Sequence, residues 1–224
     1  MNRTASPFRL LVFDWDGTLM DSVGSIVACL LHSLRELGFE ALPEASIRGT
    51  IGLGLSELLE QLYPGATRLE RLRLIECYRH HWVTEYRRRP VLIDGVRRVL
   101  ETLEAHYCLA VATGKSRTGL DRDLERTGLR SYFSATRTID EAMSKPHPQM
   151  LLELIDELGV TPSETLMVGD TTFDLEMARN AGSAAVAVLT GAQQREELMD
   201  CAPLECLPSV GELPAWLEEF VPGA

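Results

Sequence analysis

Two pairs of aspartates stand at the ends of short apolar runs, where they could share one cation. Asp14 and Asp16 follow the run LLVF in the motif DWDGT, and Asp170 and Asp174 follow the run TLMV in the motif GDTTFD. If the two runs are neighbouring strands, the four carboxylates converge and repel one another. A hard divalent cation relieves that repulsion, and Mg²⁺ is the natural candidate because it takes few protein ligands and pairs with phosphate.

The DWDGT motif by itself allows two other interpretations. A calcium loop is excluded, because the glycine stands at the fourth position instead of the sixth, no glutamate stands at the twelfth, and a strand precedes the motif. A turn in which the acids only cap the next helix stays open.

A third apolar run, CLAVA, ends at Thr113 and Gly114, directly before a predicted helix. A hydroxyl and backbone N–H groups at that position can hold a phosphate. The letters GKS that begin at Gly114 are not a Walker loop, because Leu109 stands where that motif needs its first glycine.

Lysine is rare in this chain: of 22 basic residues only Lys115 and Lys145 are lysines. Lys145 lies in SKPHP, where the prolines fix the backbone. A compact ammonium suits such a site better than a planar guanidinium. Lys115 is predicted to contact phosphate or substrate, and an ordinary surface position is the alternative.

Strand and helix patterns alternate after Pro90. Buried strands are predicted over 108–112, 165–168 and 184–189, a shorter one over 134–138, and helices ended by glycine lie between them. Repeated units of this kind predict an α/β fold with a parallel sheet covered on both faces. Ligands bind at the carboxyl ends of such strands.

Residues 22–88 read as helical throughout and interrupt this series after the first strand. We therefore predict two domains, a core of residues 1–21 and 89–224 and an inserted helical cap of residues 22–88. The glycine-spotted loop GTIGLGLS, residues 49–56, lies between two of the predicted cap helices.

Composition narrows the class of protein. The 224 residues are 45% hydrophobic and 25% charged, which is globular composition and excludes a disordered chain. The net charge of −11 opposes binding to nucleic acid and to anionic membrane surfaces. No signal peptide is readable, and five scattered cysteines without a CxxC pair favour a reduced, cytoplasmic setting.

Four separated segments together resemble the haloacid dehalogenase-like hydrolase superfamily: DWDGT, the strand end at Thr113, Lys145 in KPHP, and GDTTFD. Pro90 with Gly95, and the pair Ala181 and Gly182, resemble its phosphoglycolate phosphatase-like branch. The resemblance implies a Rossmann-like core, an inserted cap of the C1 type, and magnesium-dependent phosphoryl transfer through an aspartyl phosphate.

The resemblance also implies roles for the core residues. Asp14 would be the nucleophile, and Asp16 the acid that protonates the leaving alkoxide and then the base that activates water. Lys145 would neutralise charge on Asp14, while Thr113 and the Gly114 N–H would hold phosphate oxygens.

The same resemblance divides the metal ligands. Asp14 and Asp170 would bind Mg²⁺ directly, together with the backbone carbonyl of Asp16. Asp174 would act through a water or by orienting a ligand.

The predicted function is hydrolysis of a small soluble phosphomonoester, phosphoglycolate-like or a sugar phosphate, by a monomer or homodimer. The loop of residues 49–56 is predicted to touch the substrate, and an ordinary connection between helices is the alternative. A sugar-phosphate mutase and a non-catalytic binding module on the same scaffold are the alternatives. A dehalogenase is disfavoured, because that chemistry needs neither Asp16 nor a magnesium cluster.

Overall fold

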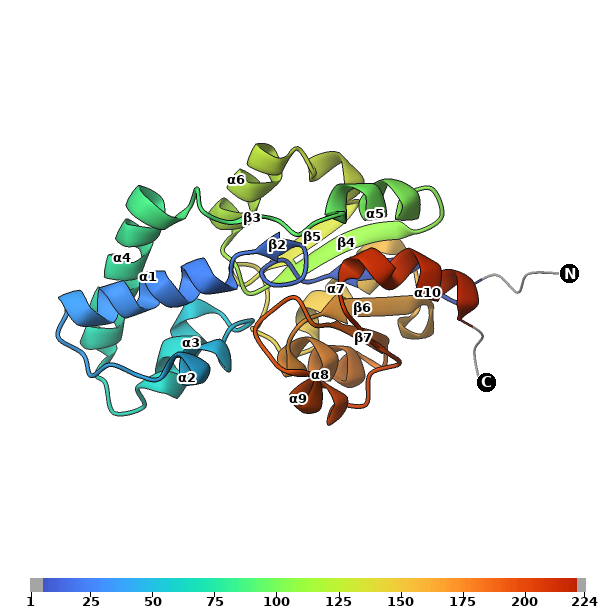
Figure 1. Ribbon diagram of the computed structural model, residues 1–224. Helices are drawn as coiled ribbons and strands as arrows, with labels where there is room; N and C mark the ends of the chain where they lie inside the picture. Colours follow the sequence, from blue (N-terminus) through green and yellow to red (C-terminus); the bar gives the residue numbers. More distant parts are fainter. Residues whose placement is uncertain (1–5, 221–224) are drawn as a thin grey trace, which may run out of the picture.

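A six-stranded parallel sheet forms the centre of the molecule in the computed structural model, which describes residues 6–220 (Figure 1). Its order is β5-β4-β1-β6-β7-β8. The strands are β1 (Leu10–Phe13), β4 (Cys108–Thr113), β5 (Ala135–Thr138), β6 (Thr165–Gly169), β7 (Ala184–Val188) and β8 (Cys206–Leu207). The predicted α/β class is therefore confirmed.

Strand β1 lies between β4 and β6, so the three strand ends that carry the sequence motifs are neighbours. Phe13 pairs with Val111 of β4 on one side and with Val168 of β6 on the other. The two strands that carry the aspartate motifs, β1 and β6, are therefore neighbours, as the predicted convergence of the aspartates required.

Helices cover both faces of the sheet. One face packs against α5 (Val96–Leu103), α6 (Arg117–Thr127) and α10 (Leu213–Glu219), and the other against α7 (Gln149–Leu158), α8 (Thr172–Ala181) and α9 (Arg195–Met199). In β1, Leu11 and Phe13 belong to the first apolar cluster and Leu10 and Val12 to the second. Because both faces are buried, the strand sequence shows no polar alternation.

The insert after β1 is all-helical, as predicted. It contains α1 (Val23–Glu36), α2 (Glu44–Arg48), α3 (Leu55–Leu62), α4 (Arg68–His81) and the π-helical turn η1 (Trp82–Tyr86). The range 68–86 is divided between α4 and η1, and α2 is a short helix of five residues. These helices pack around an apolar cluster of their own that includes Leu30, Leu34, Leu59 and Leu74.

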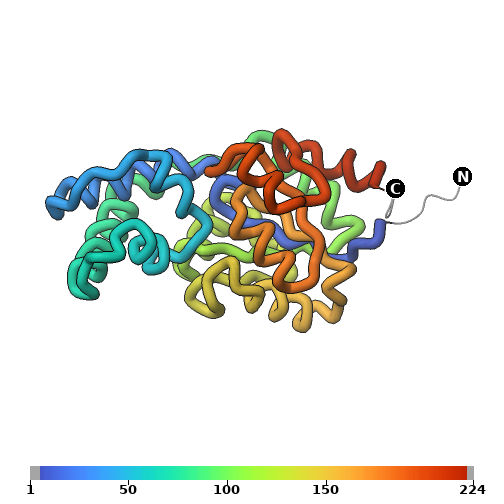
Figure 2. Tube along the Cα trace, turned by 90° about the horizontal axis from the view of Figure 1, so that it is seen from below, coloured from blue at the N-terminus to red at the C-terminus, as the bar shows by residue number. Residues whose placement is uncertain are grey.

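Two short antiparallel strands join the insert to the core. The chain leaves through β2 (Met20–Asp21) and returns through β3 (Val91–Leu92), which pair with each other. Figures 1 and 2 both place the helices of the insert at one end of the molecule, beyond the same end of the sheet. The exact limits of a separate cap domain at 22 and 88 remain a prediction.

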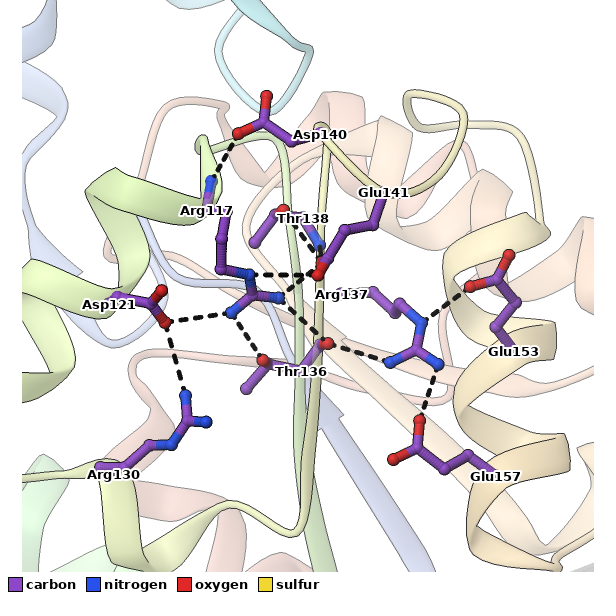
Figure 3. Close-up of polar contacts among 10 residues, drawn as sticks. All are labelled: Arg117, Asp121, Arg130, Thr136, Arg137, Thr138, Asp140, Glu141, Glu153 and Glu157. Carbon is purple, nitrogen blue, oxygen red and sulfur yellow. Dashed lines mark hydrogen bonds and ion pairs between the residues drawn. The ribbon is translucent and has the colours of Figure 1, made fainter.

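A network of hydrogen bonds and ion pairs joins α6, β5 and α7 (Figure 3), and Lys145 lies in the loop between β5 and α7. The Arg117 backbone N–H donates to Asp140 at 2.8 Å, and its guanidinium contacts Glu141 and Asp121. Arg137 of β5 binds Glu153 and Glu157 of α7 at 2.7 and 2.6 Å. These partly exposed pairs contribute little free energy each, but they tie α6, β5 and α7 to one geometry.

Short 3₁₀ turns at Arg130–Tyr132, Pro162–Glu164 and Val210–Glu212 complete the fold. Among residues 6–220, no helix combines the length and the apolar character needed to cross a bilayer.

Candidate active site

Lys145 holds two of the predicted aspartates together. Its Nζ lies 2.5 Å from Asp14 Oδ1 and 2.6 Å from Asp174 Oδ1, and all three side chains are at most 2% exposed. Burial alone would lower the pKa of Lys145, but the two carboxylates outweigh it and raise that pKa above its ordinary value. The ammonium therefore stays charged.

One ammonium does not balance the three carboxylates around it. Oxygen atoms of Asp14, Asp170 and Asp174 lie within 4.8 Å of one another. Burial, with a further contribution from Asp174, raises the pKa of Asp14 to about 7 in spite of Lys145. Burial and the charges of Asp14 and Asp174 also raise the pKa of Asp170 well above its ordinary value.

These residues fit a divalent cation. Asp14 Oδ2 is buried and has no hydrogen-bond partner among the residues that the structure describes. An unpartnered buried oxygen of this kind is costly unless something binds it. All the side-chain donors are carboxylate oxygens, which is the ligand set that Mg²⁺ prefers.

Local contacts orient Asp170 and Asp174. The Thr18 hydroxyl and the Ala192 N–H each donate to one oxygen of Asp170, at 2.8 and 2.9 Å. The Thr171 hydroxyl and N–H donate to Asp174 Oδ2, in the capping box that starts α8. Both oxygens of each carboxylate are thus engaged by the protein, and Asp174 differs from Asp170 in its direct contact with Lys145.

The close packing at Asp170 explains the glycine of the DWDGT motif. Gly17 has φ +91°, and a Cβ there would lie 2.4 Å from Asp170 Oδ2. Only glycine allows both this backbone conformation and this approach.

Asp16 differs from the expectation, because its carboxylate is not in the group of three. Lys115 Nζ lies 2.9 Å from Asp16 Oδ2, and the Ser22 hydroxyl donates to Oδ1 at 2.6 Å. Lys115 also lies 3.5 Å from Asp123, which accepts a hydrogen bond from the Trp15 ring nitrogen at 3.2 Å. Lys115 therefore balances the charge of Asp16. The cluster contains three carboxylates instead of the predicted four.

Ser22 and Asp123 are contacts of the site that the sequence did not indicate. Asp123 lies two turns into α6, and helical spacing alone does not show which neighbour its side chain meets. Lys115, predicted to contact phosphate or substrate, lies in this structure against Asp16.

Thr113 and Gly114 stand at the end of β4, beside the loop of the insert. The Thr113 hydroxyl accepts a hydrogen bond from the Lys115 N–H at 3.2 Å. A Cβ on Gly114 would lie 2.5 Å from the carbonyl oxygen of Gly52, so the loop rests directly on this glycine. On the other side of the site the Gly54 N–H donates to the Ser144 hydroxyl at 3.0 Å.

A cavity of about 630 Å³ lies between the insert and the core. Its core wall includes Asp14, Asp16, Thr113, Gly114 and Lys115. Lys145, Asp170 and Asp174 are buried and contact Asp14 or each other. The predicted site residues thus lie close together: Asp14, Asp16, Thr113, Gly114 and Lys115 line the cavity, and Lys145, Asp170 and Asp174 are buried beside Asp14.

Comparisons with known proteins identify the family of the chain. A family model described as haloacid dehalogenase-like hydrolase matches residues 11–188. The chain is 36% identical over 212 residues to a probable phosphatase IndB of Dickeya dadantii, covering 91% of each protein. It is 32% identical to a phosphoglycolate phosphatase of Mesorhizobium japonicum, covering 83% of this chain and 85% of that protein.

Solved structures show the same fold. The crystal structure of a hydrolase from Pseudomonas syringae matches with a TM-score of 0.87 and 25% identity, covering 96% of this chain and 99% of that one. The sequence-based expectation of an enzyme of this superfamily, related to phosphatases, is confirmed. The chain belongs to the haloacid dehalogenase-like hydrolase family.

Proposed function

We propose that this chain is a magnesium-dependent phosphatase that hydrolyses a soluble phosphomonoester through an aspartyl phosphate on Asp14. The observation that carries the proposal is the position of Asp14, at the cavity wall and 2.5 Å from the buried Lys145 ammonium. The names of the two relatives reported above, a probable phosphatase and a phosphoglycolate phosphatase, support it.

Asp14 would form the new bond to phosphorus while the bond from phosphorus to the leaving alkoxide breaks. A carboxylate can attack a phosphate dianion only where cations offset the repulsion. Lys145 supplies one such charge at Asp14. Thr113 and the N–H of Gly114, at the end of the neighbouring strand, would hold the non-reacting phosphate oxygens.

Asp16 would give its proton to the leaving alkoxide and then take a proton from the water that cleaves the aspartyl phosphate. Its carboxylate lines the cavity and is held by Ser22 and Lys115. Held in this way, it stays beside the substrate through both half-reactions.

Asp14 and Asp170 would hold Mg²⁺, together with the backbone carbonyl of Asp16. Asp174 would orient Asp14 through Lys145, which contacts both carboxylates. When bound, the metal offsets the negative charge of the carboxylates and of the phosphate. The unpartnered Oδ2 of Asp14 supports this assignment.

We propose further that the protein is cytoplasmic and that its partner is a small phosphorylated metabolite. All five cysteines are free thiols, which is consistent with a reducing compartment.

The test is phosphate release from a panel of phosphomonoesters, with Mg²⁺ and with a chelator. Release that depends on Mg²⁺ is the expected result. Transfer of the phosphoryl group to another position of a sugar without release would indicate the mutase. Binding of esters without either reaction would indicate a non-catalytic module.

A further inference from the structure

The cavity above Asp14 is much larger than a phosphoglycolate needs. Its volume of about 630 Å³ falls within the range of pockets that enclose drug-sized ligands, about 300–1,000 Å³. A two-carbon leaving group would leave most of this space to water.

The wall facing that space is apolar and partly aromatic. Helix α1 contributes Ile26 and Leu30, α4 contributes Ile75 and Tyr78, and η1 contributes Trp82. The rings of Tyr78 and Trp82 are 6.0 Å apart and only 13° from parallel. The two rings stack on each other and together offer a large apolar surface against which a further ring can pack.

Two arginines also line the cavity, Arg79 from α4 and Arg122 from α6. Neither guanidinium has an ion pair or a hydrogen bond within residues 6–220 as the structure describes them. A guanidinium without a partner can donate hydrogen bonds to oxygen substituents and can stack on a ring.

We infer that the substrate is a phosphomonoester with a ring system as its organic group, apolar toward the insert and carrying oxygen acceptors for the two arginines. The inference rests on the proposed phosphatase function and names its substrate class. The phosphate lies at Asp14, and the ring fills the part of the cavity that side chains of α1, α4 and η1 line. A substrate as small as phosphoglycolate leaves these side chains without contacts.

The first experiment compares four esters: ethyl phosphate, phosphoglycolate, benzyl phosphate and 2-naphthylmethyl phosphate. All four release a primary alkoxide, so differences in kcat/KM report on the organic group and not on the leaving chemistry. We expect kcat/KM for the naphthylmethyl ester to exceed that for ethyl phosphate by at least about tenfold, the smallest gain expected from one added methylene in an apolar pocket.

Variants that fill the cavity test the location. Ile75→Trp and Ile26→Trp should lower kcat/KM for 2-naphthylmethyl phosphate by about tenfold or more and leave ethyl phosphate unaffected. Leu72→Trp is the matched control, because Leu72 lies on the same helix α4 but is 47% exposed. The control should change neither value.

Binding of non-hydrolysable phosphonates separates this inference from the phosphatase function. With Mg²⁺ present, 2-naphthylmethylphosphonate should bind at least about tenfold more tightly than methylphosphonate, and Ile75→Trp should remove the difference. Phosphate release without preference for the ring esters overturns the substrate class and leaves the phosphatase standing. Tight binding that depends on the ring, without phosphate release from any ester, overturns the phosphatase function and leaves the ligand class standing.

Discussion

Lys145 Nζ lies 2.5 Å from Asp14 Oδ1, although the two residues are 131 positions apart in the chain. Neither charge could be buried alone, because an isolated ion in a protein interior costs several kcal/mol. The pair therefore links the end of β1 to the segment before α7, and the same contact that stabilises the fold places a cation at the predicted nucleophile.

Asp14→Asn should abolish turnover and leave the protein folded. The amide has the size of the carboxylate but cannot attack phosphorus, so kcat should fall by at least about 10³-fold. Phosphate release in the presence of Mg²⁺ measures it. Asp21→Asn, at an exposed position on β2, is the control and should retain full activity. Substantial activity in a folded Asp14→Asn protein would refute the nucleophile assignment.

Lys145→Met should lower stability as well as activity. It leaves three buried carboxylates without their ammonium, and the free energy of unfolding in urea should fall by about 3–5 kcal/mol. Arg137→Met is the control, because its ion pairs with Glu153 and Glu157 are partly exposed and contribute about 0–1 kcal/mol each. Equal losses in the two variants would show that Lys145 is not the counter-charge of the cluster.

Asp16→Asn should separate the two half-reactions. An ester with a good leaving group needs little acid assistance, so the aspartyl phosphate still forms, while its hydrolysis slows by about 10²- to 10⁴-fold. Rapid quenching and detection of acid-stable, protein-bound phosphate would reveal the accumulated intermediate. A steady-state rate equal to that of the unmodified enzyme would show that Asp16 is not the base.

Stabilisation by Mg²⁺ should grow with pH. Because burial raises the pKa of Asp14 from 3.8 to about 7, the folded protein keeps this proton over a range in which the unfolded chain has lost it. Without metal, the contribution of Asp14 to stability therefore falls as pH rises from about 4 to about 7. Mg²⁺ binds the ionised carboxylate, so it restores more stability above this range than within it.

Thermal melting with Mg²⁺ and with chelator, at about pH 5 and about pH 8, shows whether stabilisation by Mg²⁺ increases with pH. We expect the larger increase in Tm at the higher pH. Asp14→Asn should remove most of the difference between the two conditions. A larger increase at the lower pH would mean that a group other than these carboxylates binds the metal.

DWDGT, Thr113 and GDTTFD could be predicted to lie together because each stands at the end of a strand, and the ends of parallel strands meet at one edge. The sequence could not show that Lys115 meets Asp16, since Lys115 lies in the connection between β4 and α6, and the direction of a side chain in such a connection depends on the folded backbone. The repulsion argument therefore counted Asp16 among the uncompensated acids. The contact of Lys145 with Asp14 was expected only from the family resemblance, because nothing local in SKPHP indicates its partners.

The elements that were missed are the short ones. Helix α2 has five residues and strand β8 two, so neither carries a full period of an apolar pattern. Elements of this length depend on packing against the rest of the fold and not on local propensity. The long, buried strands and the cap helices had clear patterns, which is why the architecture was predictable while its edges were not.

Closure of the insert over the site should depend on the absence of a side chain at Gly114. A Cβ there would lie 2.5 Å from the carbonyl oxygen of Gly52 and 2.7 Å from that of Leu53. Gly114→Ala keeps the backbone N–H for phosphate but pushes the loop away from the core. Because a displacement of about 1 Å in a closing element costs about 10²-fold, kcat/KM should fall by about that factor.

Two measurements separate closure from damage to the core. The increase in Tm with Mg²⁺ should be unchanged in Gly114→Ala, because the carboxylates lie beneath the loop. Gly24→Ala is the control: it adds a Cβ in open space on α1 and should behave like the unmodified enzyme. Leu53→Ala should leave the loop seated but change the cavity wall, so it should alter the ranking of esters without altering the metal requirement. If Gly114→Ala kept full kcat/KM, the contact between loop and core would have no part in turnover.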